Sequence, residues 1–157
     1  MNSTASQSSS SWLEGGLPFR PKSKTEEGEK TDYAACVLGL GDYVEKSGFK
    51  GVVLGLSGGV DSALTAAMAV DALGRERVRC VMLPYRFTSQ DSLNDAAAIA
   101  NALGVQYDIL PIESAVLGIE KAVEPVFAGR PRDVTEENIQ ARARGVILMA
   151  ISNKFGL

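Results

Sequence analysis

A cluster of glycine, serine and aspartate at residues 55–62, GLSGGVDS, contains the residue types that bind phosphate. Glycines leave backbone N–H groups unobstructed and serine hydroxyls add short donors, so several donors can converge on an anion without a lysine. No lysine follows the glycines, which excludes the Walker pattern, and Ser57 replaces the middle glycine of the fingerprint GxGxxG. The alternative is a glycine-rich turn with only structural duties.

Asp61 stands in this loop where a carboxylate alone would repel a phosphate. The polyphosphate of ATP normally brings Mg²⁺, which accepts carboxylate oxygens as ligands. The sequence therefore predicts a nest for a pyrophosphate and assigns Asp61 as a magnesium ligand.

Apolar segments that alternate with helical patterns indicate how the loop is positioned. Strands are expected at residues 51–56, 78–83 and 105–110. Helices are expected at residues 31–48, 61–74, 89–104, 113–123 and 135–156, the last with Thr135 as its N-cap. This alternation predicts an α/β fold, a three-layer parallel sheet flanked by helices, which binds ligands at the carboxyl ends of its strands. The glycine loop follows the first strand at that edge.

Composition limits the partners and the chemistry. The net charge of −3 and the pI of about 5.0 give no electrostatic preference for nucleic acid. No apolar stretch approaches the ~18–20 residues that span a bilayer, and no targeting pattern is present, so we expect a cytoplasmic protein without membrane contact. The absence of histidine excludes Ser-His and Cys-His triads within this chain, and no catalytic residue is identified in it.

Residues 1–30 are rich in serine, glycine and charge, and they are expected to be a tail or linker before a domain at residues 31–157. Cys36 and Cys80 match no metal or redox spacing and are expected to be buried free thiols.

Two segments carry a resemblance to a known family. SGGVDS resembles the PP-loop of the ATP pyrophosphatases, which cleave ATP between its α and β phosphates. TEENIQARARG at residues 135–145 resembles the helix of NAD synthetases that carries the pattern N-x-x-A-R-x-R. Residues 82–96 and 152–156 are similar to the glutamine-dependent branch of that family. The resemblance extends from about Tyr33 to Leu157.

The resemblance implies an adenine nucleotide alpha hydrolase-like fold of the PP-loop ATPase type. It also implies the ATP-dependent amidation of deamido-NAD to NAD through an adenylated intermediate, with ammonia or glutamine as the nitrogen source. Residues 31–157 resemble the N-terminal portion of the synthetase domain, truncated after its first half. We therefore expect no amidation by the 157-residue chain alone.

The family's site residues transfer to this chain by position. The residues implied to bind ATP are Gly55, Leu56, Ser57, Gly58, Gly59, Val60, Asp61, Ser62 and, beside the adenine, Leu83. Asn138 and Arg142 are implied to bind deamido-NAD, and the helix at 135–156 is implied to form a homodimer interface.

Two arginines near these positions have weaker assignments. Arg144 lies about 200° around the helix from Arg142 and is expected to point elsewhere, towards a partner subunit. Arg86, in PYRF where the family usually has P-S-R-Y, is only a weak candidate for ATP contact.

Three alternatives remain open at this point. One is an inactive fragment that binds nucleotide through the phosphate nest alone. Another is a truncated gene product or oligomerisation module without a catalytic role. The third is a different PP-loop amidating or thiolating ligase, such as a tRNA-thiolating enzyme. The acidic composition and the lack of a basic patch argue against a tRNA substrate.

Overall fold

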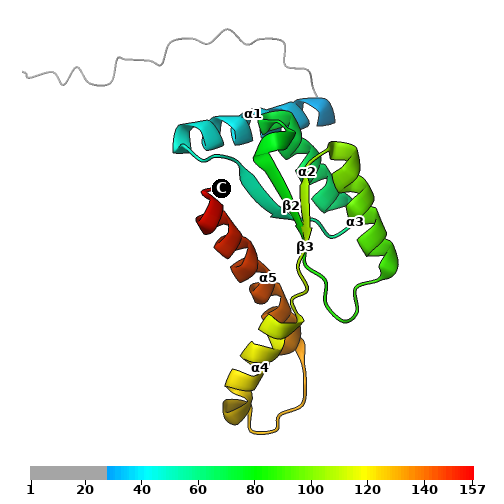
Figure 1. The fold of residues 1–157 in the computed structure, drawn as a ribbon, viewed down its shortest axis with the longest axis vertical. Helices are drawn as coiled ribbons and strands as arrows, with labels where there is room; N and C mark the ends of the chain where they lie inside the picture. Colours follow the sequence, from blue (N-terminus) through cyan, green and yellow to red (C-terminus); the bar gives the residue numbers. More distant parts are fainter. Residues whose placement is uncertain (1–27) are drawn as a thin grey trace, which may run out of the picture.

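The computed structural model describes residues 28–157, which form a parallel three-stranded sheet with helices on both faces (Figure 1). The strands, in spatial order, are β1 (Val52–Gly55), β2 (Val78–Met82) and β3 (Gln106–Ile109). Parallel pairing places Leu54 beside Cys80, and Cys80 beside Tyr107. The three carboxyl ends therefore meet at one edge of the sheet, as the sequence predicted.

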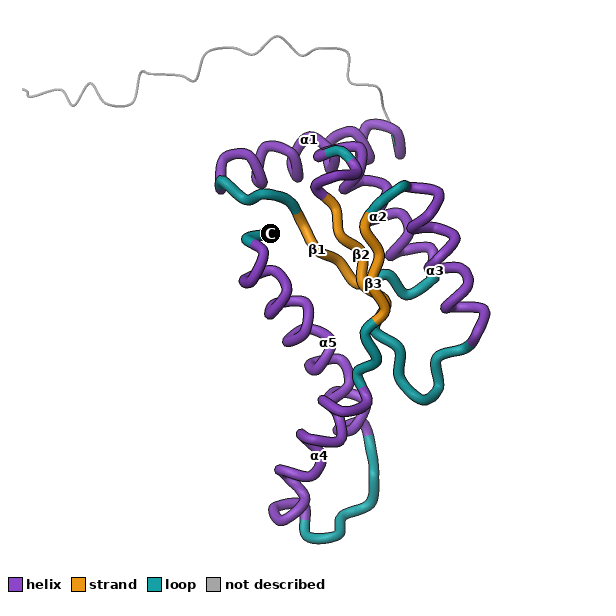
Figure 2. The backbone as a smooth tube through the Cα atoms, viewed as in Figure 1, coloured by secondary structure: helices purple, strands orange, loops and turns teal. Residues whose placement is uncertain are grey.

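Helices connect and cover the strands. They are α1 (Glu29–Ser47), α2 (Val60–Leu73), α3 (Gln90–Leu103), α4 (Glu113–Phe127) and α5 (Val134–Phe155), with a 3₁₀ turn η1 (Arg75–Arg77) before β2. Figure 2 shows α2 and α3 on one side of the sheet and α5 on the other. Helix α4 and the start of α5 extend together beyond the carboxyl ends of the strands.

Each face of the sheet has its own hydrophobic cluster, and β2 contributes to both. Val78 and Cys80 belong to the cluster under α2 and α3, whereas Val81 belongs to the cluster under α4 and α5. This division follows from the two-residue period of a strand, which sends successive side chains to opposite faces. Both faces are covered, so the predicted three-layer architecture is confirmed.

Most helix ends agree with the sequence, but α4 continues to Phe127, beyond the predicted end at residue 123, and the N-cap of α5 differs. Gly48 and Gly104 adopt the left-handed conformation that ends α1 and α3. The predicted N-cap at Thr135 is wrong, because Asp133 caps α5 and forms a capping box with Glu136. The Asp133 carboxylate accepts a hydrogen bond from the Thr135 backbone N–H at 2.8 Å, so Thr135 already lies in the first turn.

The two cysteines differ in exposure. Cys80 is fully buried in β2, as predicted, and burial raises the pKa of its thiol to about 11. Cys36 is exposed on α1, so the prediction of a second buried thiol is wrong. The predicted tail falls outside the described residues up to position 27, and α1 begins at Glu29.

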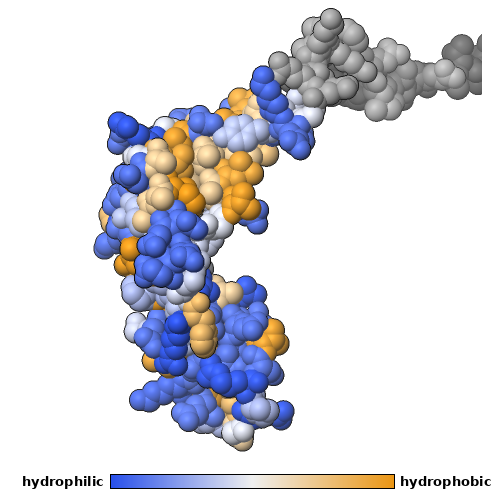
Figure 3. Space-filling model, turned by 90° about the vertical axis from the view of Figure 1, so that its right-hand side faces the viewer, coloured by the Kyte–Doolittle hydropathy of each residue, from blue (hydrophilic) through white to orange (hydrophobic). Residues whose placement is uncertain are grey.

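The surface has two parts. One is the body, formed by the sheet and the helices packed on it, and the other is the arm, formed by α4 and the start of α5. Figure 3 shows hydrophobic side chains gathered on the upper body, whereas the lower part is mainly hydrophilic. None of the helices formed by residues 28–157 combines the length and the apolar character needed to cross a bilayer.

Candidate nucleotide-binding site

Residues 55–62 connect β1 to α2 at the carboxyl edge of the sheet. The Leu56 backbone N–H donates to the Val81 carbonyl oxygen at 2.9 Å, which ties the loop to the end of β2. The hydroxyl oxygens of Ser57 and Ser62 are 3.0 Å apart, and the Ser57 backbone N–H donates to the Ser62 hydroxyl at 3.2 Å. The loop is therefore closed by hydrogen bonds between its own serines.

Gly58 is the position at which this loop requires glycine. Its φ is +84°, in the left-handed region, and a Cβ there would lie 2.5 Å from the Ser92 carbonyl oxygen on α3. Both the backbone conformation and the close approach to α3 exclude a side chain. The following Gly59 has an ordinary φ of −83°, and its N–H donates to the Ser57 hydroxyl at 3.3 Å.

Helix α2 begins directly after the glycines without a side-chain cap. The backbone N–H groups of its first turn and the positive end of its dipole are therefore available at the loop. Asp61 lies exposed in this first turn. Across residues 28–157, no group of three or more His, Cys, Asp or Glu side chains is arranged to hold a metal ion. Asp61 thus places a single carboxylate at the positive end of a helix.

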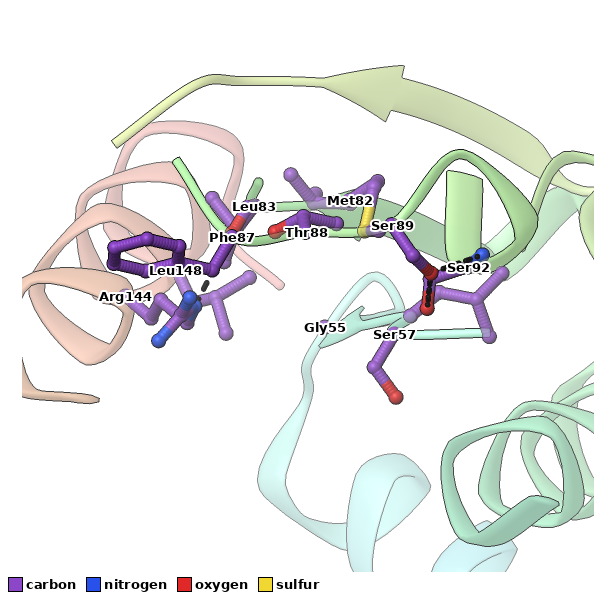
Figure 4. Close-up of a pocket in the computed structure, with 12 residues that line it drawn as sticks. Gly55, Ser57, Met82, Leu83, Phe87, Thr88, Ser89, Ser92, Arg144 and Leu148 are labelled. Atoms are coloured by element: carbon purple, nitrogen blue, oxygen red, sulfur yellow. Dashed lines mark hydrogen bonds between the residues drawn. The ribbon is translucent and has the colours of Figure 1, made fainter. Parts of the chain in front are cut away.

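A cavity of about 430 Å³ opens beside the loop (Figure 4). This volume lies within the range of small-molecule sites in proteins. Hydroxyl side chains lie towards one end of the cavity, namely Ser57, Ser89 and Ser92. An aromatic ring, a guanidinium and an aliphatic side chain lie towards the other, from Phe87, Arg144 and Leu148. One end of the cavity therefore offers hydrogen-bonding hydroxyls to a ligand, and the other offers apolar surface with a single cation.

The residues predicted to contact ATP lie in or next to this cavity. Those that line it are Gly55, Leu56, Ser57 and Leu83. Those that continue the loop into α2 without lining it are Gly58, Gly59, Val60, Asp61 and Ser62. Leu83 follows the last residue of β2 and is buried against the cluster under α5.

Arg144 points away from the face of Arg142, as predicted, but the direction suggested for it, towards a partner subunit, is wrong. It lines the cavity, and its Nε donates to the Leu83 carbonyl oxygen at 3.1 Å. Arg144 carries the only formal charge among the cavity-lining residues that the structure describes. Helix α5 packs on the sheet through Ala143 and Leu148, and this contact rotates Arg144 into the cavity.

Asn138 and Arg142 lie on a different face of α5. Both are exposed, and neither lines the cavity, in agreement with the rotation of about 200° that separates Arg142 from Arg144. Their spacing of four residues places them on one face of the helix, as predicted. Their assignment to deamido-NAD stays a prediction.

Several cavity residues that were not predicted come from the segment between β2 and α3 and from the first turn of α3. Phe87, Thr88 and Ser89 lie in the segment, and Ser92 lies in the first turn of α3. One signal was available, because this segment also leaves the carboxyl end of a strand, as the glycine loop does. Which of its side chains face the cavity depends on how the segment turns, and the residue types do not reveal that.

Arg86 lies in the same segment but faces a neighbouring hollow. That hollow also contains Tyr85 and the first turn of α5. The Nε of Arg86 donates to Glu113 at 2.7 Å, and this hydrogen bond raises the pKa of the guanidinium. Arg86 is therefore engaged with α4, and its weak assignment to ATP gains no support.

The fold and the site together define an α/β protein of the PP-loop class. The chain belongs to the NAD synthase family, whose model matches residues 32–157. This match confirms the resemblance drawn from the glycine loop and from residues 135–145.

Individual relatives agree with this assignment. The glutamine-dependent NAD(+) synthetase of Rhodobacter capsulatus is 63% identical over 125 residues, which are 80% of this chain and 23% of that protein. The enzyme of the same name from Acinetobacter baylyi is 52% identical over 124 residues, 79% of this chain and 23% of that protein. A solved structure of glutamine-dependent NAD+ synthetase from Acinetobacter baumannii in complex with ADP has a TM-score of 0.79 at 56% identity, covering 81% of this chain and 24% of that chain. The chain thus spans about a quarter of the length of these relatives.

Proposed function

We propose that this chain supplies the ATP-binding part of a glutamine-dependent NAD synthetase, a ligase that amidates deamido-NAD to NAD. The observation that carries the proposal is the position of SGGVDS beside a cavity at the carboxyl edge of the sheet. The hydroxyl groups of its two serines, Ser57 and Ser62, are hydrogen-bonded to each other. The relatives named above, which share more than half of the aligned residues with this chain, carry that activity in their names.

In this proposal the loop holds the pyrophosphate of ATP. The Ser57 and Ser62 hydroxyls and the first N–H groups of α2 are the donors. Gly58 lets the loop backbone pack closely against Ser92 of α3, which holds the loop beside the cavity. The exposed Asp61 suits Mg²⁺, which binds through one or two carboxylates and takes its remaining ligands from phosphate oxygens and water. The bound ion would neutralise negative charge on the phosphates.

The proposed reaction has two steps that suit a chain without histidine. The nicotinate carboxylate attacks the α-phosphorus of ATP and releases pyrophosphate, and ammonia then displaces AMP from the adenylate to give the amide. Adenylyl transfer depends mainly on positioning and on stabilisation of charge on oxygen atoms. At this cavity the reactants would be positioned, and the charge on their oxygen atoms stabilised, by backbone amides, hydroxyls and the Arg144 guanidinium.

Deamido-NAD is assigned to the outer face of α5, where Asn138 and Arg142 lie exposed. Two large apolar residues continue this face at helical spacing, Val146 at 68% and Met149 at 57% exposure. Exposed apolar side chains beside polar groups are typical of interaction surfaces. We therefore propose that a second copy of the chain covers this face and that deamido-NAD binds where the copies meet. The cytoplasmic location stays a prediction.

A chimera tests the function directly. The matching segment of the Rhodobacter capsulatus synthetase is replaced by residues 32–157 of this chain, and NAD formation is measured with ATP, Mg²⁺, deamido-NAD and ammonium. We expect NAD together with pyrophosphate and AMP. A folded chimera that binds ATP but releases ADP and phosphate instead would contradict the proposed reaction.

The metal role has its own variant. In the 157-residue chain, Asp61→Asn is expected to weaken the binding of Mg·ATP about tenfold while leaving metal-free ATP unchanged, because only the metal needs the carboxylate. Asp91→Asn, in the first turn of α3, is the control for loss of an exposed carboxylate. Equal Mg·ATP affinities for the wild type and Asp61→Asn would show that Asp61 is not a magnesium ligand.

A further inference from the structure

The segment between β2 and α3, residues 83–89, forms part of the cavity wall without belonging to a helix or a strand. Hydrogen bonds inside it, between Tyr85 and Thr88, close a turn and fix its local shape. They do not fix where the turn lies relative to the rest of the molecule. Contacts from other elements to this segment therefore also shape the cavity.

The start of α4 supplies two such contacts from adjacent residues. The Ile112 backbone N–H donates to the Pro84 carbonyl oxygen at 3.0 Å, and Ile112 is fully buried. Glu113, the first residue of α4, accepts a hydrogen bond from the Nε of Arg86 at 2.7 Å. A carboxylate in the first turn of a helix is favourable, because it faces the positive end of the helix dipole. The segment is thus held to α4 by one main-chain contact and one side-chain contact.

The ion pair of Arg86 and Glu113 contributes little as a source of stability. Both side chains are 51% exposed, and water and salt screen such pairs. Neither residue lines the nucleotide cavity. The pair instead connects the middle of residues 83–89 to α4, directly before Phe87, Thr88 and Ser89, which do line the cavity.

We infer that Glu113 is a positioning residue of the nucleotide site, an inference that rests on the proposed ATP site. Through Arg86 it holds residues 83–89 in the conformation that forms one wall of the cavity. Without the pair, the segment keeps its contact at Pro84 but gains freedom from Arg86 onwards. ATP must then restrict this freedom when it binds, which weakens its affinity.

Electrostatics and positioning predict opposite results for Glu113→Gln. Loss of a negative charge from a chain of net charge −3 should by itself strengthen the binding of anionic ATP. An Arg86 side chain that contacted ATP directly would strengthen it further once released from Glu113. Positioning instead predicts that Mg·ATP binds the 157-residue chain about fivefold more weakly in Glu113→Gln and in Arg86→Gln. Arg86→Lys keeps a cation for Glu113 and should bind within about twofold of the wild type.

Trypsin reports on the segment itself, because Arg86 is the only lysine or arginine between Arg79 and Lys121. Cleavage after Arg86 requires local opening of the segment. Glu113→Gln should raise the cleavage rate at this bond about fivefold, in proportion to the population of the open form. The Tm should stay within about 2 °C of the wild type, because the pair is exposed.

A second ion pair of α4 provides the matched control. Glu120 and Arg132 are also joined at 2.7 Å, but Arg132 belongs to the connection between α4 and α5, and neither residue lines the nucleotide cavity. Glu120→Gln should change neither the Mg·ATP affinity nor the cleavage after Arg86.

The remaining outcomes separate this inference from the proposed function. Mg·ATP binding by Glu113→Gln that equals or exceeds that of the wild type would overturn the positioning role, even if cleavage after Arg86 becomes faster. An equal loss of affinity in Glu120→Gln would overturn it too, because that loss would not depend on residues 83–89. Failure of the wild type to bind Mg·ATP would contradict the proposed function itself, and the positioning role with it.

Discussion

The glycine loop and helix α5 border the same cavity, but different forces shape them. Within residues 55–62, serines separated by five positions bind each other, and one glycine adopts a left-handed backbone. Helix α5 contributes Arg144 from 82 positions beyond Ser62, and packing against the sheet decides which of its faces meets the cavity. The loop is thus specified by neighbours in the chain, whereas the role of α5 depends on tertiary contacts.

This difference explains why a short motif is informative for the loop and ambiguous for the helix. In SGGVDS nearly every residue affects the local backbone. In NIQARAR a rotation of about 100° per residue separates one functional face from the next, and the motif alone does not say which face is turned inwards. Variants in the loop should therefore change the backbone, while variants in α5 should change single contacts.

The largest effect is expected from a glycine of the loop. Gly58→Ala forces a left-handed φ on alanine and brings its Cβ against the Ser92 carbonyl oxygen, so the unfolding free energy should fall by about 1–3 kcal/mol or more. ATP binding should be lost with it. Thermal unfolding and ATP titration of the purified chain measure both effects.

A glycine of α5 provides the matched control. Gly145 has an ordinary φ, and a Cβ there would meet nothing within 4 Å, so Gly145→Ala should raise the unfolding free energy by roughly 0.5–1 kcal/mol. The two alanine variants should therefore move the Tm in opposite directions. A Gly58→Ala variant as stable as the wild type would show that the loop can relax, which contradicts its close approach to α3.

An intermediate effect is expected on the outer face of α5. In the chimera with the Rhodobacter capsulatus synthetase, Asn138→Ala should raise the KM for deamido-NAD about tenfold through loss of an amide contact, with the KM for ATP nearly unchanged. Asn153→Ala, another exposed amide on α5, should change neither value. A comparable rise in both KM values for Asn138→Ala would assign Asn138 to the ATP site or to general stability.

Much of the fold followed from the sequence because its signals are local. The strands that end at Gly55 and Met82 were predicted from short apolar segments rich in β-branched residues. Gly48 and Gly104 end helices at the predicted positions. The N-cap of α5 was predicted at the wrong residue because Thr135 and Asp133 are both residue types that cap helices well. The N-cap is the last residue with an extended backbone before the helix, and here that residue is Asp133. Cys36 was misjudged because an apolar neighbourhood in sequence does not show which side of α1 is covered.

The site was only partly predictable for a similar reason. The loop residues from Gly55 to Ser57 were found because they surround the phosphate nest in sequence. Phe87 and Arg144 reach the cavity from two other segments, and only the packed structure brings them together. Motifs therefore located the phosphate end, while the opposite end required tertiary structure.

The smallest effect is expected at the start of α5, where Asp133 is exposed. Its hydrogen bonds from Thr135 lower the pKa of the carboxyl below the ordinary value of 3.8. A carboxyl whose pKa is lower in the folded chain than in the unfolded chain stabilises the fold at pH values above the unfolded pKa. This contribution is lost as the pH falls through the folded pKa. Near pH 7, Asp133→Ala should lower the Tm by a few degrees, as expected for loss of one N-cap.

The pH dependence separates the charge of Asp133 from its role as a hydrogen-bond acceptor. The difference in Tm between the wild type and Asp133→Ala should be largest above about pH 4 and should shrink towards pH 2 as the carboxylate is protonated. Asp133→Asn keeps an acceptor for the Thr135 N–H without an ionisable group, so its advantage over alanine should not vary with pH. If the wild type and Asp133→Ala differ equally at pH 2 and pH 7, the ionised carboxylate does not stabilise α5. The contribution of Asp133 would then come from its role as acceptor for the Thr135 N–H, which a protonated carboxyl or an amide can also fill.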